Sequence, residues 1–492
     1  MPNIPGERLD VGGPRRLPVG PVVLVLTGAM LLVLWARLPD LLLDHDETEH
    51  LHSAWLVSQG DVPYRDFAEN HNPPLWSLLA PLLPESQSPR DAVLAGRAVM
   101  AGCSLLSLVL AGLLARRIAG RRAMWLAPLL LAVCTYWSVY SVQIRPDVPM
   151  TTLVLLGLLV GLPTGNAPSP LRSLVAGLAF GVATAILLKA AAVSATLFAG
   201  LLVRAVLHRD DRRRSLLAAF GLAVGAAIPM ATFAAVLHGM GILDGFWLWV
   251  VRLQGPLQLN SDLPGFPITQ TIGASIERDT LCWAGLALSV VRFSAAPRQD
   301  RAILLAVVAV VLGGTAGLRL PHYQYLFPAI PLFAVLGADA VVWAGERLRS
   351  MPRVRVVAAA LLITALGASA VLHSISVASL PDDESQIARM ERILALTRPD
   401  DTVVASPPDH PIFRRDALFL WFNNPDFHNA LASLDPLPPY DRYKGDPQRL
   451  REHPPTVIVK AGSHWHSFYG IGTLAGRLFV TSADPEVLVR VH

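Results

Sequence analysis

Four carboxylic acids lie within six residues of one another, directly after the first apolar stretch of the chain. They are Asp44, Asp46, Glu47 and Glu49. Carboxylates this close repel each other, which raises some of their pKa values toward the range suited to a general base. The spacing of Asp44, His45 and Asp46 would also suit a metal ion. The structural alternative is a solvated loop at a membrane surface, with these side chains turned to water.

Cationic side chains that suit a phosphate occur at three other places. Arg145 precedes Asp147 at the start of an apolar segment, and Lys189 is the only lysine in the apolar part of the chain. Arg319 and His322 precede a later apolar segment. Charges at membrane depth are costly and are usually functional or paired, and lysine and arginine are natural partners of phosphate. Arg145 and Asp147 could instead only neutralise each other, and Lys189 could simply extend to the membrane surface.

The elements that must position these residues are membrane helices. Hydrophobic residues make up 53% of the 492 and charged residues 16%, whereas a soluble domain has about 25% charged residues. Long apolar runs without polar alternation predict spanning helices rather than a barrel. We expect an all-α polytopic protein with about eleven spans, near residues 19–38, 92–115, 123–141, 148–163, 172–189, 191–207, 215–237, 279–293, 302–318, 323–343 and 356–378.

The composition also argues against two other classes. The net charge of +4 and the pI near 9.1 come from basic residues in short loops, which disfavours nucleic-acid binding. The three cysteines, Cys103, Cys134 and Cys282, all lie in apolar runs. They predict neither a disulfide framework nor a zinc site.

The loops between the apolar segments differ in their basic charge, and this difference predicts the orientation. The richer set holds arginines near residues 116–122, 172, 204–214, 292–301 and 347–355. By the positive-inside rule this set is cytoplasmic, so the N-terminus is inside and an odd number of spans places the C-terminus outside. Lysine is rare and alanine and leucine are abundant, which indicates a GC-rich bacterial genome. We therefore expect a multi-pass protein of a bacterial inner membrane.

Three segments fall on the outer side in this topology. The first outer loop, 44–91, carries the acidic run and is the expected catalytic loop of a transmembrane module, 1–379. Short helices at 48–59 and 245–257 are expected to lie in the membrane interface. Residues 380–492 are soluble in character. A helix at 384–397 and the strand-like runs 403–406 and 456–460 predict a small periplasmic α/β domain.

The order and membrane placement of these motifs resemble a known family, the GT-C fold glycosyltransferases that use polyprenyl-phosphate sugars. The resemblance covers residues 20–345 and is greatest to the protein mannosyltransferase-like proteins and the bacterial lipid A aminoarabinose and galacturonic acid transferases. The matching positions are Asp46-Glu47, Gly60, Pro63-Tyr64, Pro73-Pro74-Leu75, Arg145-x-Asp147, Lys189 and His322-Tyr323. Two positions depart from the pattern. His50 stands where an aromatic residue is common, and Asn72, next to His71, stands where the aminoarabinose transferases carry a lysine.

The resemblance implies an inverting transfer of one sugar from polyprenyl phosphate to an acceptor hydroxyl on the periplasmic face. The acceptor class stays open between glycolipid, lipopolysaccharide, polysaccharide and protein. A lipid monophosphate is a good leaving group, so neither a metal nor another cofactor is expected, although Asp44 and Asp46 leave a divalent metal possible. The implied roles are a catalytic group, Asp46 as base with Glu47 and Asp147; a phosphate-binding group, Lys189, Arg145, Arg319 and His322; and a substrate-binding group, Tyr64, His71, Asn72 and Tyr323.

Two readings from other classes compete with this one. A transporter or lipid flippase also carries charges within membrane helices, but it keeps them near the midplane and often has internal repeats. Here the charges gather at one membrane face, and no repeat is visible. A noncatalytic scaffold for envelope assembly would tolerate loss of the acids in the first outer loop.

Overall fold

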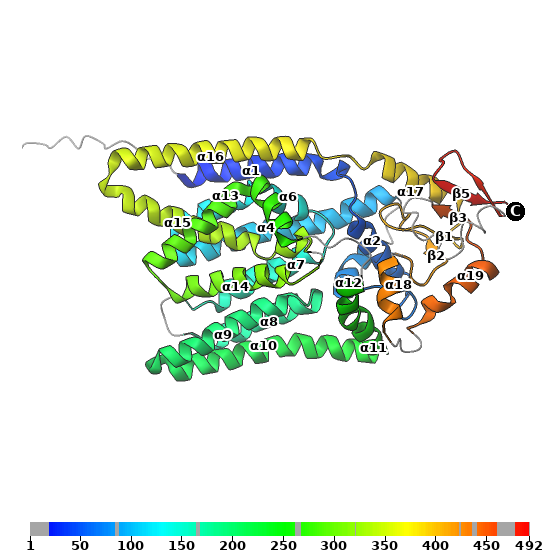
Figure 1. Ribbon diagram of the computed structural model, residues 1–492, viewed down its shortest axis with the longest axis horizontal. Coiled ribbons are helices and arrows are strands. Elements are labelled where there is room, and N and C mark those ends of the chain that lie inside the picture. The colour runs from blue at the N-terminus through cyan, green and yellow to red at the C-terminus, as the bar shows by residue number, and fades with distance from the viewer. Residues whose placement is uncertain are drawn as a thin grey trace, which may run out of the picture.

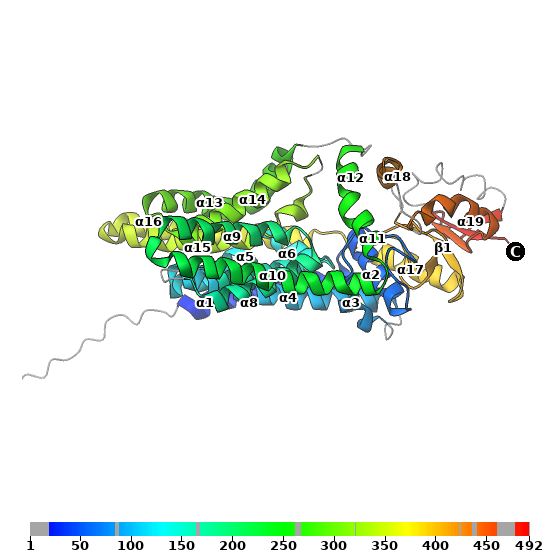
Figure 2. The same ribbon diagram turned by 90° about the horizontal axis from the view of Figure 1, so that it is seen from below.

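The computed structural model describes residues 19–83, 88–163, 168–260, 267–319, 321–422, 425–434, 440–459 and 478–491. A bundle of long helices forms one part of the molecule, and a small α/β domain at one end of the bundle forms the other (Figure 1). Between these two parts lie the shorter helices α2 (His45–Ser58), α11 (Leu243–Phe246) and α12 (Gln254–Asn260) (Figure 2). The first outer loop is therefore covered by protein on two sides.

Each apolar segment that the sequence predicts coincides with a helix. The helices are α1 (Val19–Arg37), α4 (Pro89–Ala119), α5 (Arg121–Ala132) with α6 (Thr135–Tyr140), α7 (Asp147–Gly161), α8 (Pro170–Ile186), α9 (Ala190–Leu207), α10 (Arg212–Gly239), α13 (Ile268–Ala295), α14 (Gln299–Ala316), α15 (Ile330–Arg347) and α16 (Pro352–Ala378). By length and composition, α4, α9, α10 with the turn before it, α14 and α16 can each cross a membrane, while α7 and α8 are apolar but shorter. The helical architecture is confirmed, and the count of eleven spans stays a prediction.

The boundary of α13 differs from the prediction and affects the site. The helix begins at Ile268, well before the expected span at 279–293, and Asp279 interrupts it with φ −128° and ψ 38°. The Asp279 carboxylate accepts hydrogen bonds from the backbone N–H groups of Thr135 (2.7 Å) and Tyr136 (3.1 Å). A carboxylate that satisfies these free donors caps the start of α6. The kink thus fixes α6, which carries Tyr136 and Tyr140.

The helices α8 and α10 pack with their backbones in contact. A Cβ atom on Gly225 would lie 2.1 Å from the Leu174 carbonyl oxygen, and one on Gly177 would lie 2.3 Å from the Leu222 carbonyl oxygen. Small residues permit this close approach, which is typical of helix pairs in membranes. The pair fixes the end of α8, where Lys189 follows.

The expectation that 48–59 lies in the membrane interface was wrong. This segment forms α2, and His50, Leu51 and His52 are completely buried between the bundle and the C-terminal domain. The second expected interfacial segment, 245–257, is also largely covered: Leu248 and Trp249 are buried in a hydrophobic cluster with aromatic residues of the C-terminal domain. The sequence shows that these helices are amphipathic. Packing against protein and lying in a membrane surface both select such a pattern, so the pattern does not distinguish the two.

The C-terminal domain has the expected α/β character. Its helices are α17 (Glu384–Leu396), α18 (Pro425–Ala432) and α19 (Asp446–Glu452), and its strands are β1 (Thr402–Val404), β2 (Arg415–Asp416), β3 (Val457–Val459), β4 (Phe479–Thr481) and β5 (Val487–Arg490). The order in the sheet is β2-β1-β3-β5-β4. β1 runs parallel to β2 and β3, with Val403 opposite Val457, and β5 runs antiparallel to β3 and β4. The side of the membrane on which the domain lies stays a prediction.

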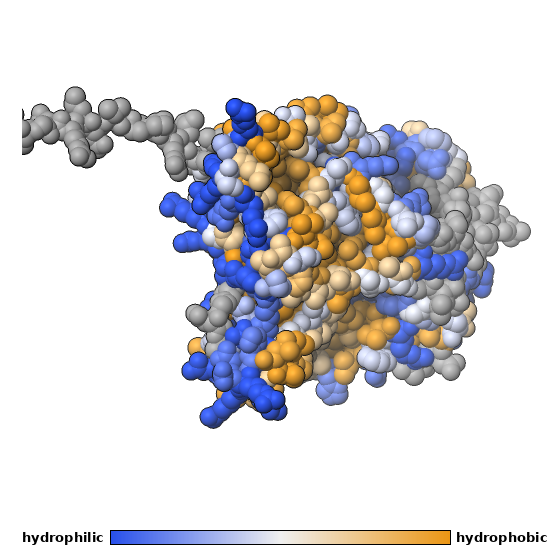
Figure 3. Space-filling view, turned by 60° about the vertical axis from the view of Figure 1, so that its left-hand side comes forward, coloured by the Kyte–Doolittle hydropathy of each residue, from blue (hydrophilic) through white to orange (hydrophobic). Residues whose placement is uncertain are grey.

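The surface of the bundle changes character along its length. Hydrophilic residues gather at the end away from the C-terminal domain, and a broad apolar surface follows (Figure 3). The turn between α15 and α16 lies at this end and exposes Arg349 (Figure 1). An apolar band next to a basic end is expected where a protein crosses a membrane.

Candidate active site

Asp44 begins α2 and fixes the direction of the helix. Its carboxylate accepts a hydrogen bond from the Asp46 backbone N–H (3.1 Å), and its own backbone N–H donates to Glu47 Oε2 (3.1 Å). This reciprocal capping box satisfies backbone donors that a helix start leaves free. The helix therefore begins inside the acidic run, and Asp46 lies on the first turn of a rigid element.

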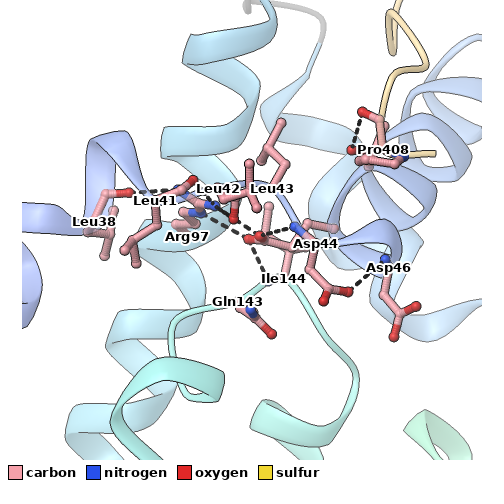
Figure 4. Close-up of polar contacts among 12 residues, drawn as sticks. Leu38, Leu41, Leu42, Leu43, Asp44, Asp46, Arg97, Gln143, Ile144 and Pro408 are labelled. Atoms are coloured by element: carbon pink, nitrogen blue, oxygen red, sulfur yellow. Dashed lines mark hydrogen bonds and ion pairs between the residues drawn. The ribbon is translucent and has the colours of Figure 1, made fainter. Parts of the chain in front are cut away.

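Glu47 is a buried anchor between α2 and α4. Arg97 of α4 donates from Nε and Nη2 to the two carboxylate oxygens of Glu47, each at 2.9 Å, and the Ile144 backbone N–H donates to Oε1 at 3.2 Å. Arg97 also donates to the carbonyl oxygens of Leu38 and Leu41, which lie beside it in Figure 4. Because Glu47 is completely buried and both its oxygens are occupied, it can orient α2 but does not face a substrate.

Arg145 contacts two of the other acids in this run, Asp44 and Asp46. Its Nη1 contacts Asp46 Oδ2, its Nη2 contacts Asp44 Oδ1, and its Nε donates to Gln143 Oε1 at 2.9 Å. The guanidinium carbon lies 5.4 Å from the centre of the Tyr140 ring. The Arg145 side chain is 5% exposed, whereas those of Asp44 and Asp46 are 32% and 24% exposed. One buried cation thus holds two carboxylates that remain accessible.

Asp44 and Asp46 differ in their electrostatics. Burial raises the pKa of both carboxyl groups, and the positive charge of Arg145 lowers it. At Asp46 the net result is a pKa below the usual range. At Asp44 burial prevails, with added repulsion from Asp46 and Glu47, and the pKa is raised. Asp46 is therefore ionised at neutral pH and can accept a proton.

A second ion pair lies beside an apolar cavity. Lys189, in the break between α8 and α9, contacts Asp147 at the start of α7. Its Nζ is 3.5 Å from the Gln324 carbonyl oxygen and 5.2 Å from the centre of the Tyr325 ring. Lys189 and Tyr325 line a cavity of about 500 Å³ whose other walls, from α9, α12, α14 and Pro328, are mainly apolar. The arrangement suits an apolar chain with an anionic end.

The segment between α14 and α15 approaches both ion pairs. Tyr325 lies within reach of the charges of Asp147 and Asp46. The His322 ring lies 5.9 Å from the Tyr325 ring, and burial lowers its pKa although the Asp46 carboxylate opposes this. These two residues therefore lie close to Asp46.

Two further residues of the same segment were expected at the site. The Tyr323 ring lies 5.3 Å from the Tyr136 ring, which stacks on Tyr140 at 4.8 Å. Tyr323 thus adjoins the aromatic residues beside Arg145. Arg319 lies exposed in the turn after α14.

A cluster of two glutamates and a histidine lies next to Asp46. His71 Nδ1 is 3.2 Å from Glu49 Oε1 and 3.0 Å from Glu69 Oε1, and Glu69 Oε2 accepts a hydrogen bond from Ser53 Oγ at 2.8 Å. Burial and the Glu49 charge raise the pKa of Glu69 to about 8. Ligand atoms of Glu49, Glu69 and His71 lie within 4.8 Å of one another, so this group could hold a divalent cation or share a proton.

Two residues predicted to bind substrate have other contacts here. Tyr64 is completely buried, has a positive φ of 65°, and donates its hydroxyl to the His71 carbonyl oxygen at 2.6 Å. Asn72, also buried, donates from Nδ2 to the carbonyl oxygen of Ala185 at the end of α8 at 2.8 Å. Both residues therefore shape the first outer loop and fix it to the bundle.

Several residues of this site were not predicted from the sequence. Glu69 received no role, although it lies two residues before His71 in the same loop, and this spacing was a usable signal. Gln143 and Tyr325 also lie beside residues that were singled out. The Arg97 anchor had no comparable signal, because it lies 50 positions from Glu47 in an otherwise apolar helix.

Comparisons with known proteins identify the fold. No protein-family model matches the chain, and no curated protein matches its sequence. The crystal structure of ArnT from Cupriavidus metallidurans bound to undecaprenyl phosphate aligns over 96% of this chain and 98% of that chain, with a TM-score of 0.65 and 17% identity. The chain has a GT-C glycosyltransferase fold. The fold expected from the sequence motifs is confirmed.

A second GT-C structure matches over a smaller part of the chain. The oligosaccharyltransferase from Archaeoglobus fulgidus in complex with Zn and sulfate aligns over 76% of this chain and 55% of that chain, with a TM-score of 0.52 and 14% identity. The sequence motifs cover residues 20–345 alone, whereas the alignment with ArnT extends over nearly the whole chain. The GT-C comparison therefore includes the C-terminal α/β domain.

Proposed function

We propose that the chain is a membrane glycosyltransferase that moves one sugar from a polyprenyl-phosphate donor to an acceptor hydroxyl, with inversion. One observation carries the proposal: Arg145 feels the charges of both Asp46, which is ionised and accessible, and Asp147, whose partner Lys189 lines an apolar cavity of about 500 Å³. The ArnT structure with undecaprenyl phosphate and an A. fulgidus AglB structure with a dolichol-phosphate support a lipid-phosphate donor. In our topology the reaction takes place at the periplasmic face of a bacterial inner membrane.

The reaction needs a base for the acceptor hydroxyl and positive charge for the leaving phosphate. Asp46 accepts the proton of the acceptor hydroxyl while the hydroxyl oxygen forms a bond to the anomeric carbon. The bond from that carbon to the phosphate oxygen breaks, and polyprenyl phosphate leaves with the electron pair. Lys189 and Arg145 stabilise the charge that develops on the phosphate, since fixed cations are most effective where water is excluded. Direct displacement inverts the anomeric centre.

The polyprenyl chain would occupy the apolar cavity beside Lys189. Tyr325 lies on the cavity wall and within 5.2 Å of the Lys189 Nζ, so it borders the phosphate position. Asn72 is tied to Ala185 and carries no charge, so it cannot replace the phosphate contact of the lysine in the aminoarabinose transferases. In this chain Lys189 and Arg145 must supply that charge.

The same geometry favours a reaction without a metal ion. The Arg145 guanidinium lies against both Asp44 and Asp46 and supplies positive charge where a cation between these carboxylates would lie. Glu49, Glu69 and His71 form a separate set of possible ligands beside this pair. We therefore propose that chelation leaves the transfer rate unchanged. A loss of transfer with EDTA that Mg²⁺ or Mn²⁺ restores would contradict this part of the proposal.

The proposal is tested by transfer of radiolabel from polyprenyl-phosphate sugars to endogenous membrane acceptors. The comparison is between wild type, Asp46→Asn and the matched control Asp40→Asn, an exposed acid whose side chain lies 3.4 Å from Arg90. We expect label transfer in wild type and Asp40→Asn and loss of transfer in Asp46→Asn, at equal amounts of folded protein. The labelled product would show whether the acceptor is a lipid, a polysaccharide or a protein.

Near-normal turnover in Asp46→Asn would exclude Asp46 as the base. Absence of transfer by wild type from a broad panel of donors would favour a transporter or scaffold instead.

A further inference from the structure

The catalytic helix is attached to the C-terminal domain along its second and third turns. Thr48 Oγ1 donates to the Pro408 carbonyl oxygen at 3.2 Å, a contact visible beside Pro408 in Figure 4. Just before the helix, Leu43 exchanges hydrogen bonds with the Gln386 side chain, at 2.8 and 3.3 Å. Six positions after Asp46, His52 makes two contacts with the same domain. At about 1.5 Å per residue, His52 lies about 9 Å along the axis from Asp46.

Both ring nitrogens of His52 contact the C-terminal domain. Its Nδ1 lies 2.7 Å from the Ile412 carbonyl oxygen, and its Nε2 lies 2.8 Å from Asp416 Oδ2. A carbonyl oxygen can only accept, so Nδ1 carries a hydrogen. Asp416 is held ionised, because His410 and His52 together outweigh the effect of burial and lower its pKa. The Nε2–Oδ2 contact between these two enclosed side chains thus has the geometry of a buried ion pair.

His410 completes the cluster as a neutral group. Its Nδ1 accepts a hydrogen bond from the Ile412 backbone N–H at 3.1 Å, so the ring hydrogen resides on Nε2, which lies 3.2 Å from Asp416 Oδ2. Burial and the His52 charge lower the pKa of His410 to about 4, in agreement with a neutral ring. A metal ion needs the lone pair of Nε2, which this tautomer does not offer. With the Nδ1 lone pair occupied by the Ile412 N–H, the three side chains fit an ion pair flanked by a neutral ring better than a metal centre.

The ion pair is enclosed by protein. His52 and His410 are completely buried, with ring centres 3.9 Å apart, and the Trp421 ring lies 4.6 Å from His52. Removing one member of such a pair leaves an uncompensated buried charge, which strongly destabilises the local structure. A charged hydrogen bond also fixes direction more tightly than apolar packing does. The pair therefore constrains where α2 lies relative to the C-terminal domain.

We propose that the buried His52–Asp416 ion pair is a positioning element of the active site, through which the C-terminal domain holds α2 so that Asp46 meets Arg145. The inference rests on the proposed transferase function. His52 and Asp416 do not touch substrate in it; they act through the rigid helix. Displacements of about 1 Å of a catalytic group can reduce turnover on the order of 100-fold.

The test compares Asp416→Ala with Asp416→Asn in the full-length protein. Asparagine can donate its amide hydrogen to the Nε2 of a neutral His52, so the contact survives without charges, whereas alanine abolishes it. With a polyprenyl-phosphate sugar, we expect Asp416→Ala to lower kcat on the order of 100-fold with an unchanged donor KM, and Asp416→Asn to retain most of the activity. Hydrogen exchange at the start of α2 should rise in the alanine variant alone.

If Asp416→Ala fails to fold, the double variant His52→Leu with Asp416→Leu replaces it in the test. Replacing a buried ion pair by apolar residues is often neutral for stability, so a fall in its kcat reports positioning. Normal kcat in a folded alanine or double variant, with wild type active, overturns the proposal. Stoichiometric zinc in the purified wild type that Asp416→Asn loses would also overturn it, as a metal site. A wild-type protein without transferase activity would contradict the proposed function instead. In that case, hydrogen exchange at the start of α2 that is the same in Asp416→Ala and wild type would overturn the positioning role.

Discussion

Asp46 and Glu69 both interact with His71 and differ in the pH at which each accepts a proton. The pKa of Asp46 is held below its usual range, while that of Glu69 is raised to about 8. A base must be ionised to act, so its pKa sets the acidic limb of the rate profile. The two residues therefore predict different profiles for the same reaction.

We expect kcat/KM to remain constant as the pH falls from above 8 and to decline only below the ordinary aspartate range, about 3.9. The measurement is the initial rate of transfer against pH, for wild type and Glu69→Gln. An acidic limb near pH 8 in wild type, together with loss of transfer in Glu69→Gln, would assign the base to Glu69.

Substitutions of Lys189 test whether this single residue binds the donor phosphate. Lys189→Ala removes the cation and leaves Asp147 without its partner, so we expect donor KM to rise on the order of tenfold or more. Lys189→Arg keeps the charge and should retain more of the donor affinity. Lys444→Ala is a suitable control, because Lys444 is 56% exposed in the C-terminal domain. Equal effects of the alanine and arginine variants would show that Lys189 has no specific role toward phosphate.

At the scale of elements, the backbone contact between α8 and α10 determines where Lys189 lies. Asn72 binds the end of α8, and Lys189 follows directly, so a displaced α8 would alter both the first outer loop and the cavity. Glycine is required here for close approach, since a Cβ at Gly225 would lie 2.1 Å from a carbonyl oxygen.

Gly225→Ala should therefore destabilise the protein by about 1–3 kcal/mol, the usual effect of overpacking. Gly102→Ala in α4 is the control, because its Cβ would meet no atom within 4 Å, and it should be neutral or slightly stabilising. Thermal unfolding of both variants in detergent, followed by size-exclusion fluorescence, measures the difference. An equal midpoint for the two variants would contradict the close packing.

At the scale of the whole molecule, the two ends of the bundle should lie on opposite sides of the membrane. In a variant without Cys103, Cys134 and Cys282, we introduce Glu452→Cys or Arg349→Cys, both at exposed positions. A membrane-impermeant maleimide added to intact spheroplasts should label the cysteine at 452 and spare the one at 349. The reverse pattern would invert the topology and place Asp46 on the cytoplasmic side.

The amino-acid sequence by itself determined where the helices are and which charged residues stand out from them. In lipid, the backbone N–H and C=O groups of a long apolar run must form hydrogen bonds within the run, which only a helix allows. The eleven predicted segments therefore coincide with helices whatever their partners are. The acidic run at 44–49 and the cations at 145 and 189 were recognisable because charges in an apolar context are rare. The C-terminal α17, β1 and β3 followed from local periodicity alone.

Only the tertiary structure decided the pairings, because periodicity contains no information on distant partners. Arg97 binds Glu47 across 50 positions and Asp416 binds His52 across 364. These contacts distinguish Glu47, a buried anchor, from Asp46, an accessible carboxylate, although the two acids are neighbours in the chain. They also show α2 to be buried between two parts of the protein. Polar residues of α2 form hydrogen bonds with the C-terminal domain, which lies more than 300 residues away in the sequence.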